Sequence, residues 1–167
     1  MEVNTRKVKG RRSVRYSSLN EFLLEAKQLA ETPVRTLGNW SQGQIYMHLA
    51  RAMDGSIDGV EMSVPAPMRW IMILLFKKRF LENGLPAGFP APDGPMKPEA
   101  TSTAEGLAAL QRAVDRQNLE TARVPHPAFG KLDQEGWGRF HLRHAEMHMS
   151  FIVVEDAHAA DGDSSDS

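Results

Sequence analysis

Histidine is the residue type whose spacing points most clearly to chemistry in this 167-residue chain. Three of its six histidines fall within eight residues, His141 to His148. His144 and His148 are four residues apart, so on a helix their rings project from the same face, one turn apart. Two imidazoles at this spacing can bind one metal ion at about 2.1 Å each. The pair alone is a weak indication, because such a spacing also arises by chance.

A third histidine strengthens this interpretation. His48 lies on the apolar face predicted for a helix that begins near Ser41, where leucine or isoleucine is usual. A buried imidazole costs free energy unless its ring nitrogens are bonded, and one shared cation would satisfy three such rings. We therefore predict a metal site formed by His48, His144 and His148. The alternative is three core histidines, each hydrogen-bonded to its own neighbour.

Other polar residues near this set are predicted to have supporting or structural roles. The three histidines from His141 to His148 span about 10 Å of helix axis, so one ion cannot bind all of them. We expect His141, and His126 in a proline-flanked loop, to be structural or to orient the ligands from behind. Glu146 is predicted to point away from the pair as a solvated charge.

Most other catalytic schemes are excluded by composition and motif. The chain has no cysteine, which removes disulfides, zinc–thiolate sites, thiol nucleophiles and iron–sulfur clusters. It has no Gly-x-Ser-x-Gly motif, no P-loop and no dinucleotide fingerprint. Of the catalytic schemes considered, the histidine metal site is therefore the one that the residues favour.

Helices must position these histidines, and helical periodicity recurs along the chain. Three predicted helices begin with a capping box, at Ser18, Ser41 and Ser102. Residues 68–81 predict a further helix that is apolar nearly all round, so most of it should be buried. The last helix is predicted over residues 133–154. No strand alternation is evident, and the expected fold class is all-α.

Between and beyond these helices lie a long loop and two charged tails. Residues 85–98 contain five prolines among glycines, which predicts a loop of the kind that often walls a pocket. Residues 1–15 hold six basic residues and one acidic residue, whereas residues 155–167 hold five acidic residues and no basic one. We expect two flexible tails around a helical domain at residues 16–154.

The same patterns bear on partners and location. Aromatic residues are not interleaved with the basic residues of the first tail, so we do not expect nucleic-acid binding. The most apolar run, residues 68–76, is too short to span a bilayer, which needs about 20 apolar residues. No signal peptide is evident. We expect a cytoplasmic protein that takes a small-molecule substrate, with no membrane partner, and leave a homodimer open.

Three segments of the sequence resemble the DinB/YfiT-like superfamily, especially an uncharacterised branch of it. They are a Trp-led histidine helix at residues 37–50, a His-Pro-x-x-Gly turn at 126–132 and a His-x-x-x-His helix at 135–149. The resemblance covers about residues 18–154. It implies an up-down-down-up four-helix bundle in which three histidines hold a divalent metal. Matched position by position, these are again the three predicted ligands. One departure is Met147, where the branch often has a second histidine beside His148.

The resemblance also implies a range of activities. Members of the superfamily include metal-dependent thiol S-transferases, an isomerase with a thiol cofactor and proteins assigned as hydrolases, and a shared fold does not choose among them. Three neutral ligands leave a bound Zn²⁺ or Ni²⁺ with its full charge, which acidifies a bound water or thiol. We expect a metalloenzyme that uses a low-molecular-weight thiol in S-transfer. The alternatives are a metal-dependent hydrolase, a metal-binding protein without catalysis and a non-catalytic helical stress-related module.

Overall fold

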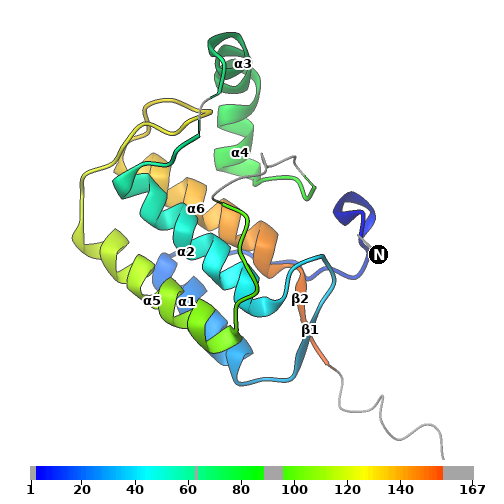
Figure 1. The fold of residues 1–167 in the computed structure, drawn as a ribbon. Helices are drawn as coiled ribbons and strands as arrows, with labels where there is room; N and C mark the ends of the chain where they lie inside the picture. Colours follow the sequence, from blue (N-terminus) through cyan, green and yellow to red (C-terminus); the bar gives the residue numbers. More distant parts are fainter. Residues whose placement is uncertain (1–2, 63, 89–95, 156–167) are drawn as a thin grey trace, which may run out of the picture.

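The protein is described from a computed structural model that covers residues 3–62, 64–88 and 96–155 (Figure 1). The described chain is mostly helical, with one small sheet. Four longer helices make up the main body: α1 (Leu19–Ala30), α2 (Gln42–Asp58), α5 (Thr103–Leu119) and α6 (Gln134–Met149). The predicted acidic tail from residue 156 onward and residues 89–95 of the proline-rich loop lie outside the described residues.

The starts of the helices agree with the capping signals in the sequence. The Ser18 hydroxyl accepts a hydrogen bond from the Glu21 backbone N–H. At α2 and α5 the full capping box is present, with the N-cap serine and the third helical residue bonded reciprocally. These side chains satisfy backbone donors that a helix start leaves unpaired. The predicted N-termini of these three helices are confirmed.

The four longer helices pack around one apolar core, and α2 lies in extensive contact with α5. Two glycines make this close approach possible. A Cβ atom at Gly43 would lie 2.3 Å from the Thr101 carbonyl oxygen, and one at Gly106 would lie 2.3 Å from the Gly43 carbonyl oxygen. A larger residue would push the helices apart, so the two glycines set the position of α2, which carries His48.

The end of α6 differs from the prediction. The helix ends at Met149, and the chain then forms β2 (Ile152–Val154) instead of continuing as helix to Val154. This strand pairs antiparallel with β1 (Val34–Thr36). Three consecutive β-branched residues favour the strand, and the β1 segment supplies the backbone partners that they need. The sheet adds a β element that the all-α expectation lacked.

The predicted helix at residues 68–81 is present but is not buried. It consists of α3 (Ala66–Ile71), a π-helical stretch η2 (Met72–Lys77) and α4 (Lys78–Asn83), and it projects from one end of the molecule (Figure 1). Trp70 is 71% exposed and Leu74 is 82% exposed. The expectation of burial was wrong, because only one side of this segment packs against the rest of the described chain.

The basic N-terminal segment makes contacts with the helices. Residues Thr5–Lys7 form a short 3-10 helix, η1. Further on, the Arg12 backbone N–H donates to the Ser150 carbonyl at 3.0 Å, and the Arg12 guanidinium pairs with Glu25 at 2.6 Å. The boundary between a tail and a helical domain at residues 15 and 16 stays a prediction.

Candidate metal centre

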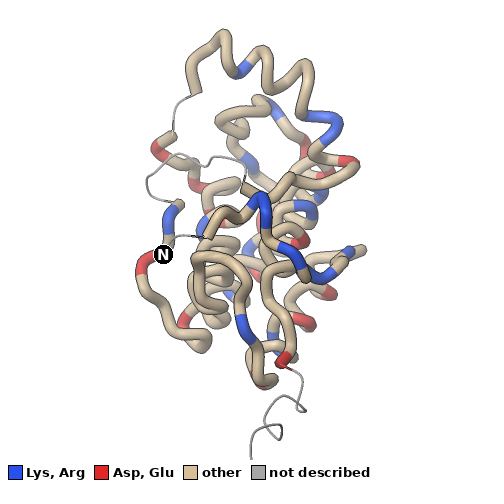
Figure 2. The backbone as a smooth tube through the Cα atoms, turned by 90° about the vertical axis from the view of Figure 1, so that its right-hand side faces the viewer, with Lys and Arg blue, Asp and Glu red and all other residues tan. Residues whose placement is uncertain are grey.

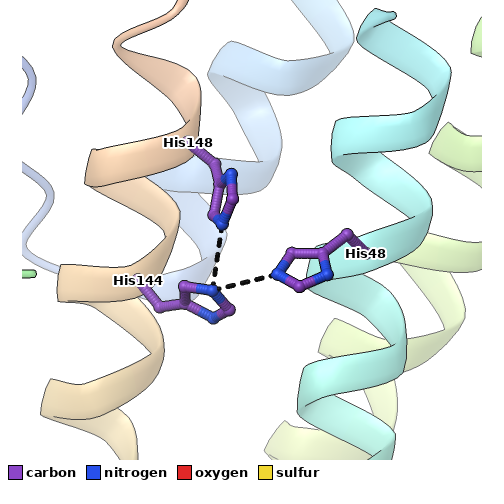
Figure 3. A group of neighbouring side chains, drawn as sticks. All are labelled: His48, His144 and His148. Atoms are coloured by element: carbon purple, nitrogen blue, oxygen red, sulfur yellow. Dashed lines mark hydrogen bonds between the residues drawn. The ribbon is translucent and has the colours of Figure 1, made fainter. Parts of the chain in front are cut away.

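The three histidines singled out in the sequence meet in the interior (Figure 3). His48 comes from α2, whereas His144 and His148 come from successive turns of α6. The Nε2 atom of His144 lies 3.1 Å from the Nε2 atom of His48 and 3.1 Å from the Nε2 atom of His148. One possible ligand atom from each residue lies within 4.8 Å of the others. Two helices that are far apart in the sequence thus present three ring nitrogen atoms to one point.

The backbone fixes the proton of one ring. His48 Nδ1 lies 2.7 Å from the Met96 carbonyl oxygen. A carbonyl can only accept, so Nδ1 of His48 carries the proton and Nε2 faces the other two rings with a free lone pair. Metal-binding histidines characteristically donate their second ring N–H in this way.

The remaining protons cannot satisfy both contacts at His144. A neutral imidazole carries one N–H. A proton on His144 Nε2 can point to His48 or to His148, but not to both. If His144 Nε2 carries no proton, its lone pair faces the lone pair of His48 Nε2. A cation that accepts all three lone pairs removes this conflict. Tetrahedral ligands at about 2.1 Å lie about 3.4 Å apart, close to the two 3.1 Å contacts of His144.

Burial keeps these rings in the neutral form that binds a metal. Desolvation lowers the pKa of His48, and it lowers the pKa values of His144 and His148 well below their usual range. The rings also lie close to one another, so a proton on one disfavours a proton on the next. Nδ1 of His144 is buried and has no hydrogen-bond partner among the described residues. The cluster is therefore uncharged near neutral pH.

Trp40 and Met96 also contact the cluster, and neither was assigned a role from the sequence. The Trp40 ring stacks on His148 at 5.3 Å between centroids and tilts against His48 at 4.8 Å. The position of this tryptophan directly before the capping box of α2 was a usable signal. The Met96 carbonyl could not have been found, because any residue type supplies a carbonyl.

His141 and His126 lie outside the cluster. His141 is 1% exposed, and its Nε2 atom lies 3.1 Å from the Ser56 hydroxyl. His126 uses Nδ1 to accept hydrogen bonds from the backbone N–H groups of Ala128 and Phe129, which closes the turn before α6. Burial lowers the pKa of His126 to about 4 and that of His141 to about 3. Whether either orients a metal ligand stays a prediction.

Glu146 is not the solvated charge that the sequence predicted. It is buried, and its carboxylate accepts hydrogen bonds from the Tyr16 backbone N–H at 2.8 Å and from Arg143 at 2.7 Å. The basic N-terminal segment covers this side of α6, and Arg15 lies 3.5 Å from the same carboxylate. Burial raises the pKa of Glu146. The contacts of Glu146 with Tyr16 and Arg15 tie the N-terminal segment to the helix that carries two of the three histidines.

A comparison with models of protein families identifies the family of the chain. The model of a family of proteins of unknown function, DUF1569, matches residues 8–155. The chain belongs to this family. The match includes the three clustered histidines of this DUF1569 protein and all of its helices from α1 to α6. Searches of curated proteins and of solved structures gave no match. Among the described residues of the DUF1569 chain, no helix has the length and apolar character needed to cross a membrane.

Proposed function

We propose that His48, His144 and His148 hold a divalent metal ion and that the protein is a metal-dependent enzyme for a small molecule. The observation that carries this proposal is the pair of Nε2–Nε2 contacts at His144, which neutral imidazoles cannot both satisfy with their own protons. The burial of the cluster supports the proposal further, and so does the hydrogen bond from His48 Nδ1 to the Met96 carbonyl oxygen.

We further propose that α1, α2, α5 and α6 form a bundle of the DinB/YfiT type, with up-down-down-up topology. The contacts of α2 with α5 and α6, and of α1 with α5 and α6, support this arrangement. The positions of the histidines support it as well, because the resemblance expects one ligand on the second helix and two on the last.

Zn²⁺ and Ni²⁺ are among the ions that imidazole ligands suit, and we propose one of them here. When bound, such an ion supplies Lewis acidity that lowers the pKa of a coordinated water or thiol. The contributions of the chain are positional. The Met96 carbonyl holds His48 in the correct tautomer, and the packed ring of Trp40 restricts the motion of His148. We favour thiol S-transfer as the reaction, with hydrolysis as the alternative.

Elemental analysis of protein purified without a polyhistidine tag tests the metal. We expect close to one zinc or nickel per chain after dialysis. Metal at trace level, with no uptake of added Zn²⁺ or Ni²⁺, would leave the histidines as core residues.

A cobalt-substituted sample tests the chemistry. An open coordination position should let an added small thiol change the visible spectrum of Co²⁺. A change with a thiol or with imidazole shows an open coordination position, which both S-transfer and hydrolysis require, and tighter binding of the thiol supports S-transfer. A spectrum that no added ligand alters would indicate a closed site that binds metal without catalysis.

A further inference from the structure

The segment formed by α3, η2 and α4, residues 66–83, presents large apolar side chains to solvent. We call it the α3–α4 arm. Five of its apolar residues are between 48% and 82% exposed: Met68, Trp70, Ile71, Leu74 and Leu75. Isolated exposed apolar residues are common, but five within eight positions form a contiguous patch, and such patches mark interaction sites.

The arm is anchored to the body, so this exposure is not that of a loose segment. Met72 and Phe80 are buried on its inner side, where they pack with aromatic residues of α6 and of the preceding turn. The Lys77 ammonium group donates to the Lys131 carbonyl oxygen at 3.0 Å. One side of the arm is therefore satisfied within the chain, and the other side lacks a partner among the described residues.

The charge of the arm is entirely positive until its last turn. It carries Arg69, Lys77, Lys78 and Arg79, and the first acidic residue is Glu82. The Lys78 side chain is 87% exposed. Figure 2 shows the arm along one edge of the molecule, with its basic residues in blue. A tryptophan and two leucines beside several exposed basic residues are the composition of a helix that lies at a membrane interface.

The positive charge of the arm indicates which kind of partner can cover its apolar face. A second copy placed symmetrically on it would bring the same basic side chains together, which is unfavourable. An uncharged apolar surface would bury the leucines but offer no anionic groups to the basic residues, of which Lys78 pairs only loosely with Glu82 at 4.0 Å. An anionic lipid surface satisfies both, because it offers acyl chains beside acidic headgroups.

We propose that the α3–α4 arm binds the protein peripherally to anionic membranes. Trp70, Leu74 and Leu75 enter the boundary between headgroups and acyl chains, while Lys78 and Arg79 contact the headgroups. The arm lies along the surface and does not cross the bilayer. The sequence led us to expect no membrane partner, and the exposure of this helix is the reason to revise that expectation.

Flotation of the full chain with vesicles tests the proposal. We expect binding to vesicles of phosphatidylcholine with 30% phosphatidylserine at about 0.1 M salt, and little binding to phosphatidylcholine alone. Each basic residue near an anionic surface contributes roughly fivefold to affinity. The double variant Lys78→Glu/Arg79→Glu should therefore lose at least about 25-fold, and Leu74→Glu should lose a comparable factor.

Two matched variants serve as controls. Leu119→Glu changes a leucine on α5 that is also 82% exposed, and Arg35→Glu reverses an exposed charge on β1. Both should bind vesicles as the wild type does. Tryptophan fluorescence should shift to the blue on addition of anionic vesicles, and Trp70→Phe should abolish this shift, because Trp70 is the tryptophan in the patch.

Other results would overturn the proposal. Absence of binding to anionic vesicles would do so, as would equal losses in the arm variants and the controls. A dimer in analytical ultracentrifugation that Leu74→Glu dissociates, without vesicle binding, would assign the face to a second copy instead. Vesicle binding is measured on metal-free protein, so the outcome does not depend on the proposed metal site.

Discussion

His144 is the residue at which the two interpretations of the histidine cluster separate. Its Nε2 atom contacts two other ring nitrogens at 3.1 Å, and its Nδ1 atom is buried without a partner among the described residues. A core histidine in such a position would pay for the burial of its polar atoms without compensation. A metal ion would remove the conflict at Nε2, because it accepts all three Nε2 lone pairs, whereas Nδ1 of His144 is unpartnered among the described residues in either case.

Substitution of single histidines distinguishes ligands from neighbours. His48→Ala, His144→Ala and His148→Ala should each reduce bound metal to trace level, because each removes one of three protein ligands. His141→Ala and His126→Ala should retain near-stoichiometric metal, with at most the 10–100-fold loss of affinity typical of residues behind the ligands. Metal content by elemental analysis, with circular dichroism to verify folding, measures both groups. Loss of metal in His141→Ala but not in His144→Ala would place the ligands one turn away.

The clustering of His48, His144 and His148 could be predicted from the sequence because each histidine lies on the inward face of a helix with a clear period. The starts of α1, α2 and α5 were predictable for a similar reason, since capping is a local interaction. The end of α6 was not, because β2 depends on pairing with β1, more than a hundred residues earlier. The exposure of the α3–α4 arm was not predictable either, because an apolar helix carries no mark of which side is covered.

At the scale of elements, the approach of α2 to α5 determines where His48 lies. Gly106→Ala should reduce the free energy of unfolding by about 1–3 kcal/mol, because the added methyl group meets the Gly43 carbonyl oxygen at 2.3 Å. Gly138→Ala on α6 is the matched control. Its methyl group would meet nothing within 4 Å, and alanine should raise helix stability by about 0.5–1 kcal/mol. Urea denaturation of both variants measures the difference. Equal effects of the two substitutions would argue against a tight α2–α5 contact.

At the scale of the whole molecule, the core should maintain the fold without the metal. The apolar core includes fully buried residues from α1, α2, α5 and α6, and a chain of this length does not need an ion to fold. Chelation should therefore leave the far-ultraviolet circular dichroism spectrum nearly unchanged. The melting temperature should fall, because a ligand that binds only the native state stabilises it by mass action. Loss of helicity on chelation would show that the metal is structural.

Buried histidines should make the stability of the metal-free protein depend on pH. Desolvation lowers the pKa of His126 to about 4 and that of His141 to about 3, whereas an unfolded histidine titrates near 6.5. As the pH falls below about 6.5, these histidines bind protons in the unfolded chain but stay neutral in the native state. The free energy of unfolding therefore decreases. The slope approaches about 1.4 kcal/mol per pH unit for each such histidine, and above about pH 7 it disappears. Urea denaturation in chelator at pH 7.5, 6.5 and 5.5 measures this slope.

His126→Asn supplies the control, because an asparagine oxygen can still accept from the Ala128 and Phe129 N–H groups but does not titrate. This variant should lose one histidine's share of the slope, and an unchanged slope would mean that His126 is protonated in the native state.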